Sequence, residues 1–299
     1  MRKTIESWRA AIGVSVEVFG KKLYTAFGLW LIALLTPMDA QQSYQAQPTD
    51  DVWYYDQAFN PGFTAILRCW GDGVNAVDPT GARPALNFSY ALAKWRLTPF
   101  RAGVTYQLLE ARIVVTQTQP PGYTREEGVL YPLEARDLNH TDFSEASWDY
   151  NAPNNPYPGA IIFGTGAMVN YRIDAPFTIP IDLLANRGAF ETYFNQAVST
   201  TGELGIAFVS AIDPAGQGGT RFYRFYSRND AGRRGPLLQI VYRVAGDVNG
   251  NGCTDDADLL AVLFRFGQAG SNLPEDLNRD GVVDDADLLT VLFHFGNGC

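Results

Sequence analysis

The sequence predicts a mainly β protein: an antiparallel β-sandwich with jelly-roll-like connections, followed by a small α-helical domain of two loop–helix repeats. Three observations predict this class. Residues 51–245 contain short stretches rich in aromatic and branched side chains, separated by turn-forming residues. In residues 246–299 apolar side chains recur every three or four positions. An acidic stretch also occurs twice in this last part of the chain.

The strand pattern is clearest in the segment LLEARIVVTQ. Every second residue from Leu109 to Val115 is apolar, and the charged residues Glu110 and Arg112 lie between them. This alternation is expected of a strand with one buried face. The same texture recurs in NFSYALAKWRL, GELGIAFVSAI, TRFYRFYSR and PLLQIVYRV. Long connections such as QTQPPGYTREEG and NAPNNPYPG complete the pattern of an antiparallel sandwich. Only residues 182–198 suggest one or two short helices.

Residues 1–40 predict an export signal peptide. A basic leader precedes an apolar run from about Leu23 to Leu35, and the small residue Ala40 would precede the cleavage site. A membrane anchor is the alternative, but the run is shorter than the roughly 20 apolar residues that a spanning helix needs. We therefore expect a secreted protein, extracellular or at the cell surface, that meets the membrane only through this signal. The polar residues 41–50 predict a flexible lead-in.

The formal net charge of −9 is concentrated near the C-terminus. Residues 246–299 hold ten Asp or Glu and two Arg, a balance of −8. Such a segment repels nucleic acids and anionic membranes, and no basic patch upstream offsets it. We therefore expect no nucleic-acid partner, and we expect the acidic segment to attract cations.

The acidic stretch that begins at Asp247 matches the one that begins at Asp276 in 14 of 21 positions. Each has the spacing of a 12-residue calcium loop, in which oxygen ligands stand at positions 1, 3, 5, 7, 9 and 12 and a glycine at position 6 makes the sharp turn. The candidate ligands of the first loop are Asp247, Asn249, Asn251, Cys253, Asp255 and Asp258. Those of the second loop are Asp276, Asn278, Asp280, Val282, Asp284 and Asp287.

Calcium fits this set because it is a hard cation that takes roughly six to eight oxygen ligands. Cys253 and Val282 would contribute backbone carbonyls, and Asp255 and Asp284 would act through water. The sequence thus predicts two Ca²⁺ sites. The second loop offers four carboxylates and the first loop three, so we expect the second site to bind more tightly. The alternative is a pair of solvated acidic turns whose aspartates cap the following helices.

The three cysteines are Cys69, Cys253 and Cys299. A disulfide between Cys253 and Cys299 would tie the last residue to the first acidic loop, and in the loop-entropy description it contributes roughly 4 kcal/mol. That contribution would matter for a segment of about 50 residues, which buries little apolar surface. Two free thiols are the alternative.

These features make residues 246–299 resemble a type I dockerin, the paired EF-hand-like calcium module that docks onto a cohesin domain of a scaffold protein. The resemblance rests on the D-x-N-x-D/N-G loops, on Asp followed by Leu at position 12, and on the duplication. It implies cohesin contacts at loop positions 10 and 11, where dockerins often have a Ser-Thr type pair. These positions hold Asp256, Ala257, Asp285 and Ala286.

Leu260, Phe264, Leu289 and Phe293 fall off the main apolar stripe of the two predicted helices. The two phenylalanines stand where many dockerins have basic residues. If exposed, the four side chains would form an apolar patch suited to a partner surface. Alternatively, they close the small domain's own core or pack on the sandwich. A cohesin is one candidate partner, and an intramolecular dock is another.

Residues 51–245 offer little support for catalysis, and we assign no catalytic residue. The whole chain has two histidines, which argues against His-centred catalysis and multi-histidine zinc sites. Loop carboxylates could form the acid and base pair of a glycosidase, although such residues are more often solvated surface. They include Asp137, Asp142, Glu145 and Asp149. Loop aromatics that could stack on sugar rings are Trp148, Tyr150 and Tyr157.

Residues 51–244 also resemble DNRLRE domains, β-sandwich modules that include a carbohydrate-binding group. The resemblance rests on DDVWYYDQ, ALAKWRLTPFRAGVTYQLLEARIVVTQ, ASWDYNAP, IPIDLL, GELGIAFV and FYSRNDAGRRGPLLQIVY. Where the family tends to have Ser-Arg-Glu, this chain has Ser227, Arg228 and Asn229. The resemblance implies the sandwich fold and assigns no sugar-contacting residue.

The domain organisation expected is a signal peptide (1–40), a lead-in (41–50), a DNRLRE-like sandwich (51–245) and a dockerin-like calcium domain (246–299). The function expected is that of a secreted, non-catalytic modular protein linked to polysaccharide breakdown. Its sandwich would bind carbohydrate or serve surface structure, and its calcium module would attach it to a cohesin-like or other surface protein. The alternatives are a polysaccharide-degrading enzyme with a dockerin and a purely structural cell-surface assembly protein.

Overall fold

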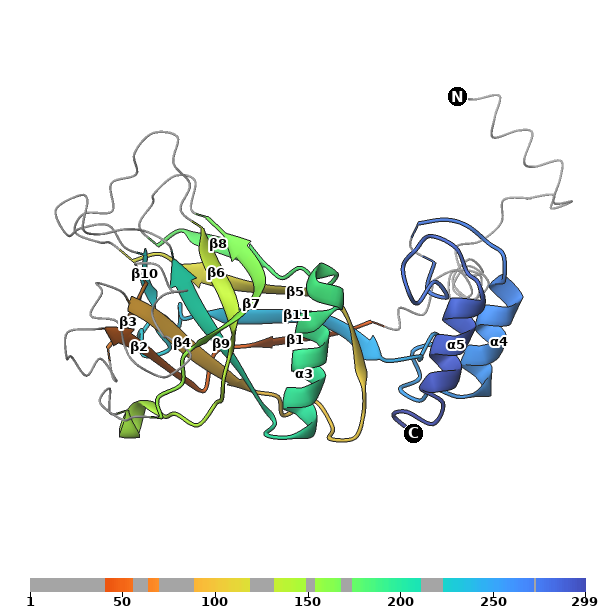
Figure 1. Ribbon diagram of the computed structural model, residues 1–299, viewed down its shortest axis with the longest axis horizontal. Coiled ribbons are helices and arrows are strands. Elements are labelled where there is room, and N and C mark those ends of the chain that lie inside the picture. The colour runs from red at the N-terminus through yellow and green to blue at the C-terminus, as the bar shows by residue number, and fades with distance from the viewer. Residues whose placement is uncertain are drawn as a thin grey trace, which may run out of the picture. The chain divides into compact units, whose positions relative to one another are not determined.

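The described part of the chain contains two larger antiparallel sheets, a two-stranded sheet, helix α3 and two short C-terminal helices (Figure 1). The computed structural model describes residues 41–55, 64–69, 89–118, 132–148, 154–167, 174–210, 223–271 and 273–299. The predicted signal peptide lies outside these ranges. We call residues 41–245 the β domain and residues 246–299 the C-terminal module.

The larger sheet has five strands in the order β2-β4-β9-β6-β7. They are β2 (Asp50–Tyr55), β4 (Ser89–Arg96), β9 (Glu203–Ser210), β6 (Leu133–Leu138) and β7 (Pro158–Gly166). The second sheet, in the order β1-β11-β5-β8, comprises β1 (Gln42–Ala46), β11 (Leu237–Val244), β5 (Tyr106–Thr116) and β8 (Pro176–Pro180). A two-stranded sheet pairs β3 (Ile66–Cys69) with β10 (Tyr223–Tyr226). All these pairings are antiparallel.

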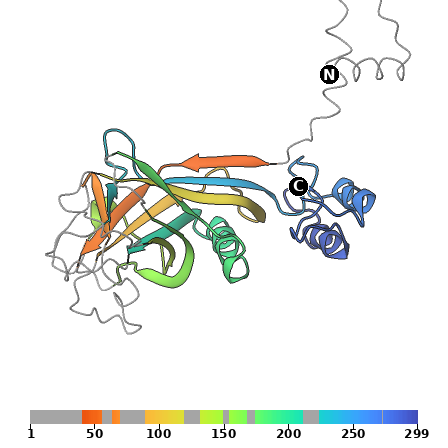
Figure 2. The ribbon, with the colours of Figure 1, turned by 90° about the horizontal axis from the view of Figure 1, so that it is seen from above.

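One apolar core lies between the two larger sheets, which form separate layers in Figure 2. Trp95 and Phe208 contribute to it from the five-stranded sheet, and Ile113 and Ile240 contribute from the four-stranded sheet. This arrangement is that of two sheets packed face to face. The prediction of a mainly β, antiparallel fold is therefore confirmed.

A second apolar cluster covers the other face of the five-stranded sheet. It includes Leu92 of β4, Ala207 of β9 and Trp148. Strands β4 and β9 are therefore buried on both faces, which explains why GIAFV reads as a continuous apolar run instead of an alternating one. Trp148 follows the 3₁₀ turn η1 (Glu145–Ser147), packs edge-on against Phe143 and is 5% exposed.

The helix predicted within residues 182–198 is confirmed. The 3₁₀ turn η2 (Ala185–Arg187) is followed by Gly188 in the left-handed region and then by α3 (Ala189–Ser199). Phe190 and Phe194 on α3 enter the core between the sheets. The carboxylate of Glu191 in the first turn accepts a hydrogen bond from the Leu108 amide of β5 at 2.7 Å, and thereby fixes the helix to the four-stranded sheet.

Two expectations about strands were wrong. The lead-in is not flexible, because residues 42–46 form edge strand β1 and pair in register with β11. In β5 the register shifts at a β-bulge opposite Val241 and Tyr242, so that Leu108 is buried while Leu109 is only half-buried. Alternation in a single strand cannot show this shift, because the bulge depends on the partner strand.

The C-terminal module is built around helices α4 (Asp256–Arg265) and α5 (Asp285–Phe293). Its small core contains Val262 of α4, Val291 of α5 and three buried loop residues, Val248, Leu277 and Val283. A backbone bridge between Ala269 and Val282 connects the segment after α4 to the second loop. Among the described residues, no helix is long and apolar enough to cross a membrane.

Candidate functional site

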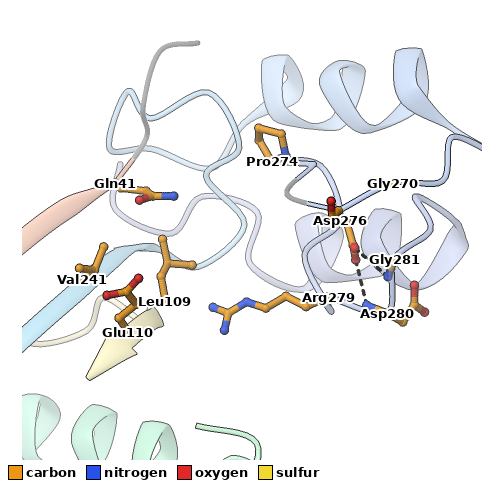
Figure 3. A pocket seen from close by; sticks show the side chains of 11 residues that line it. Gln41, Leu109, Glu110, Val241, Gly270, Pro274, Asp276, Arg279, Asp280 and Gly281 are labelled. Carbon is orange, nitrogen blue, oxygen red and sulfur yellow. Dashed lines mark hydrogen bonds between the residues drawn. The ribbon is translucent and has the colours of Figure 1, made fainter. Parts of the chain in front are cut away.

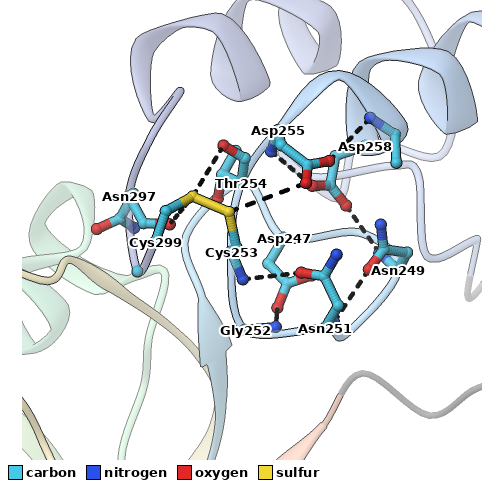
Figure 4. The surroundings of a disulfide bond; sticks show 12 residues. Asp247, Asn249, Asn251, Gly252, Cys253, Thr254, Asp255, Asp258, Asn297 and Cys299 are labelled. Carbon is cyan, nitrogen blue, oxygen red and sulfur yellow. Dashed lines mark hydrogen bonds between the residues drawn. A yellow bond between two sulfur atoms is a disulfide. The ribbon is translucent and has the colours of Figure 1, made fainter.

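The first acidic loop is closed by two buried aspartates (Figure 4). The carboxylate of Asp247 accepts hydrogen bonds from the amides of Gly250 at 2.7 Å and Gly252 at 2.8 Å. The carboxylate of Asp258 accepts from the amides of Val248 and Asn249 at 2.8 and 2.9 Å. Positions 1 and 12 therefore hold the loop backbone from its two ends.

The second loop repeats this arrangement. The carboxylate of Asp276 accepts from the amides of Asp280 at 3.2 Å and Gly281 at 2.9 Å. That of Asp287 accepts from Leu277 at 2.6 Å and Asn278 at 3.1 Å. The duplication seen in the sequence is therefore a duplication of three-dimensional structure.

Positions 3 and 5 make short turns in both loops, because their side-chain oxygens bond to backbone amides two residues ahead. Asn249 and Asn251 accept from the amides of residues 251 and 253 at 3.0 and 2.8 Å. Asn278 and Asp280 accept from residues 280 and 282 at 2.9 and 3.0 Å. Position 6 requires glycine, since Gly252 and Gly281 have φ values of +88° and +94°.

The aspartates at positions 9 and 12 also start the helices. Asp255 is the N-cap of α4 and accepts from the Ala257 amide, while the Asp258 side chain accepts from the Asp255 amide. Asp284 and Asp287 form the same capping box at α5. The capping role weighed as an alternative is therefore present, and it leaves open whether the loops also bind a cation.

The electrostatics of the loops favour a cation. Asp258 and Asp287 are fully buried, and Asp247 is 2% exposed. Within the described ranges, no basic side chain forms a salt bridge with any of them. Burial raises the pKa of Asp247, amide hydrogen bonds from Gly252 and Gly250 lower it, and the nearby charge of Asp258 raises it further. Two buried carboxylates in one loop are costly unless positive charge compensates them.

The nearest strongly buried positive charge is Arg243, at the end of β11. Burial lowers its pKa to about 10, while the carboxylates of Asp247 and Asp258 act in the opposite direction. Arg243 donates to Gln107 and to the carbonyl of Pro274, at 2.6 and 3.0 Å. Arg243 therefore interacts with the first loop through its charge, while its guanidinium donates its hydrogen bonds to Gln107 and Pro274.

The loop residues themselves fit a hard cation, since every candidate side-chain donor is a carboxylate or amide oxygen. The side chains do not, however, gather into a ready-made cluster. In the described part of the chain, no three Asp, Glu, His or Cys side chains come together as a metal-binding group. The carboxylate oxygens of Asp247 and Asp276 accept hydrogen bonds from loop amides instead.

Cys253 and Cys299, the pair expected from the sequence, form a disulfide. The last residues also bond to the segment after the first loop: the Thr254 amide donates to the Asn297 carbonyl at 2.9 Å, and the Gly296 amide donates to the Thr254 carbonyl at 2.8 Å. The C-terminal tail is thus fixed to the first loop by covalent and hydrogen bonds (Figure 4). Cys69 is a free, buried thiol.

The two helices expose an extensive apolar surface, which we call the apolar helix face. Phe264 and Phe293 are 82% and 83% exposed. The remaining members are Leu260, Leu263, Phe266, Leu289, Leu292 and Phe295. Four of these eight, at 263, 266, 292 and 295, were expected on the inner stripe; the helices are too short and the core too small to bury them. Asp256, Ala257, Asp285 and Ala286 are exposed where the helices begin.

The described aromatics that were candidates for sugar contact, Trp148 and Tyr157, differ in exposure. Trp148 follows η1 and is buried in the second apolar cluster, where it is not open to a ligand. Tyr150 lies outside the described residues. Tyr157 is 38% exposed, and its amide donates to the Asn139 side chain at 2.8 Å. Sequence placed all three in loops, but could not show that one loop folds back onto the sheet.

Within the described ranges, no hydrogen bond joins two of the candidate acid and base residues. Asp142 is exposed, and the Asp137 carboxylate accepts a hydrogen bond from the Ile161 amide. Asp149 lies outside the described residues. Glu145 is buried beside Asp51, a residue that the sequence analysis did not single out. A buried pair has no access to a polymeric substrate. Its signal in the sequence was weak, because the two acids are 94 residues apart.

Three residues that were not expected from the sequence join the second loop and the segment before it to the β domain: Gln107, Arg243 and Arg279. The available signal was the single basic residue of the second loop, Arg279, at the position of Gly250 in the first loop. No protein-family model matches the chain, and no curated protein matches it.

Proposed function

We propose that the C-terminal module is a calcium-binding docking module that attaches the β domain to a partner protein outside the cell. The observation that carries this proposal is the duplicated loop with its fully buried aspartate at position 12 and no salt-bridged cation within the described residues. Calcium bound to the loop oxygens would neutralise these carboxylates and supply folding energy to the module. The disulfide agrees with an oxidising, extracellular location.

Calorimetric calcium titration of the protein from Gln41 onward tests the metal sites. We expect two binding events, with the tighter one lost on combining Asp276→Ala with Asp287→Ala. The matched control is Asp285→Ala, which removes an exposed carboxylate from the same helix start. Heat of binding that is absent in the unmodified protein, or unchanged in the double variant, would contradict the proposal.

We further propose that the apolar helix face is the docking surface and that the partner is a cohesin-like domain. An exposed apolar surface of this extent is typical of interaction sites, and its phenylalanines come in equivalent pairs on the two helices. Exposed aspartates at the helix starts give the surface an acidic border. This border favours a partner with basic residues around an apolar centre, and disfavours a second copy of the same acidic module.

Binding to purified cohesin domains tests the docking surface. We expect binding in calcium and loss of binding in chelator. Phe264→Asp with Phe293→Asp should abolish binding while both calcium sites persist, whereas Arg265→Ala, on the same helix, serves as the control. Equal binding by the phenylalanine variant would show that this face is not used.

For the β domain we propose a non-catalytic role in carbohydrate binding or surface structure. The burial of Glu145 beside Asp51 argues against an acid and base pair on a substrate groove. Tyr157 is the remaining exposed candidate for sugar stacking among the described residues. Affinity electrophoresis on soluble polysaccharides, with Tyr157→Ala for comparison, distinguishes the two roles: retardation that depends on Tyr157 supports carbohydrate binding, and its absence with every glycan supports surface structure.

A further inference from the structure

We infer that the β domain completes the second cation site, because strand β5 holds the backbone of the second loop in place through Arg279 and Leu277. Calcium binding and the attachment of the module to the β domain would then be thermodynamically linked. This inference rests on the proposed calcium function of the loop.

Two short hydrogen bonds join the loop to β5. The guanidinium of Arg279 donates to the Leu108 carbonyl at 2.6 Å, and the Gln107 side chain donates to the Leu277 carbonyl at 2.6 Å. Leu277 and Arg279 are positions 2 and 4 of the loop and lie between the proposed ligands Asp276 and Asp280. The β domain is therefore hydrogen-bonded to the segment that carries these proposed ligands.

Position 4 holds different residues in the two loops, Gly250 in the first and Arg279 in the second. Position 4 adopts positive φ in both: Gly250 has φ +77° and Arg279 has φ +62°. Glycine takes this conformation freely, whereas other residues adopt it only with backbone strain. The first loop thus avoids strain that the second loop accepts. In the second loop, the hydrogen bond to Leu108 offsets the strain.

These two contacts belong to a larger set of hydrogen bonds around β5, which we call the polar seam. Arg243, which is buried, donates to Gln107 and to the Pro274 carbonyl ahead of the second loop. The Glu191 carboxylate accepts a hydrogen bond from the Leu108 amide. Burial raises the pKa of Glu191, whereas this amide and the nearby positive charges, chiefly Arg279, lower it. Three of these hydrogen bonds cross from the β domain to the module: Arg279 to Leu108, Gln107 to Leu277, and Arg243 to Pro274. Separation of the module would therefore break three partly buried hydrogen bonds together.

The seam does not seal the loop from solvent. A cavity of about 530 Å³ borders it, lined by Leu109 and Glu110 of β5 and by Asp276, Arg279 and Asp280 of the loop (Figure 3). In Figure 3 the Arg279 side chain extends from the loop toward Leu109 and Glu110, while Asp276 and Asp280 lie farther back along the cavity. A cation can therefore reach these carboxylates from water while Arg279 remains attached.

The C-terminal tail provides a second attachment, on the side of the first loop. The Asn297 side chain accepts from the Thr105 amide at 2.9 Å and donates to the Thr105 carbonyl at 2.8 Å. Arg101 donates to the Gly298 carbonyl at 2.7 Å. The first loop bonds to the adjoining end of β11, where the Asp247 amide donates to the Val244 carbonyl and the Thr254 hydroxyl to the Ala245 carbonyl. Within the described residues, hydrogen bonds to β5 are made by the second loop and not by the first. The linkage is therefore expected at the second site.

The test is calcium titration of Arg279→Gly, which gives the second loop the residue of the first. We expect the second site to weaken by at least about fivefold, the lower end of typical coupling between sites, and the first site to change less than twofold. Gln107→Ala, which leaves the loop sequence intact, should produce the same selective loss. Arg112→Ala is the control, because this β5 arginine is exposed and bonds to Gln239.

Hydrogen exchange gives an independent readout. Calcium should slow exchange of the amides at residues 105–108 in the unmodified protein but not in Arg279→Gly. If the unmodified protein binds no calcium, the proposed function itself fails. If it binds two ions and both variants keep the second site, or if Arg279→Gly tightens it by relieving strain, the linkage is overturned while the calcium function stands.

Discussion

Asp51 and Glu145 place two carboxylates side by side inside the β domain. Asp51 is 2% exposed, and its Oδ1 has no hydrogen-bond partner within the described residues. Its Oδ2 accepts from the Arg228 amide at 2.7 Å, and Glu145 accepts from the Asp51 amide at 3.2 Å. Burial raises the pKa of Asp51 well above its ordinary value; the Arg228 amide lowers it, and Glu145 raises it further. Burial therefore favours the protonated form of Asp51.

The raised pKa of Asp51 predicts that rising pH weakens the β domain. A group whose pKa is higher in the folded state stabilises fully below its unfolded pKa, about 4 for Asp, and loses that contribution as pH rises through the folded value. Asp51→Asn stays neutral throughout. Relative to this variant, we expect the unmodified protein to lose about 1–3 kcal/mol of unfolding free energy as pH rises.

Urea unfolding followed between pH 4.5 and 8.5 measures this difference. Asp142→Asn, which replaces an exposed carboxyl in the same loop region, is the control and should follow the unmodified protein. Parallel curves for Asp51→Asn and the unmodified protein would show that Asp51 does not hold the proton.

At the scale of elements, the turn at position 6 fixes each loop. Gly281 has φ +94°, and no atom lies within 4 Å of the place where a Cβ would stand. Alanine there would cost about 1–2 kcal/mol through the backbone alone. We expect Gly281→Ala to weaken the second calcium site roughly tenfold, the equivalent of about 1.4 kcal/mol.

The control for this variant is Gly267→Ala, which has φ +80°, equal space around the missing Cβ and a position outside both loops. It should lower stability similarly without selective loss of the second site. Equal calcium affinities for both variants would mean that the position 6 turn does not shape the site.

The disulfide stabilises the module as an element. It closes a loop with a sequence separation of 46 residues, for which the chain-entropy description gives about 4 kcal/mol. Replacing Cys253 and Cys299 together with serine should therefore lower the unfolding free energy of the module by about 2–4 kcal/mol without moving the transition of the β domain. Chemical denaturation at saturating calcium measures this unfolding free energy. An unchanged unfolding transition of the module would contradict a stabilising role of the disulfide.

Sequence periodicity predicted the strands and helices whose signal is local. Alternation located β5 and β11, and the spacing of glycine and aspartate located both loops and the starts of α4 and α5. It failed where structure depends on distant partners: β1 is a strand because it pairs with β11, and Trp148 is buried because its loop folds over the five-stranded sheet. The contacts of Arg279 and Gln107 were hidden for the same reason.

Across the whole molecule, charge and apolar surface are divided between the two parts of the chain. The C-terminal module carries a balance of −8 out of a net charge of −9, and it exposes the apolar helix face. The β domain carries the main core and supplies the strand that receives the second loop. The proposed cation binding would offset the acidic charge of the module and fix its loops.

The most direct test of the central claim is anomalous scattering from crystals of the protein grown in calcium, recorded at a wavelength where calcium scatters anomalously. The account predicts two peaks, one in each acidic loop, about 2.3–2.6 Å from oxygens of Asp247 and Asp258 and of Asp276 and Asp287. No peak in either loop, with these carboxylates still bonded to loop amides, would contradict it.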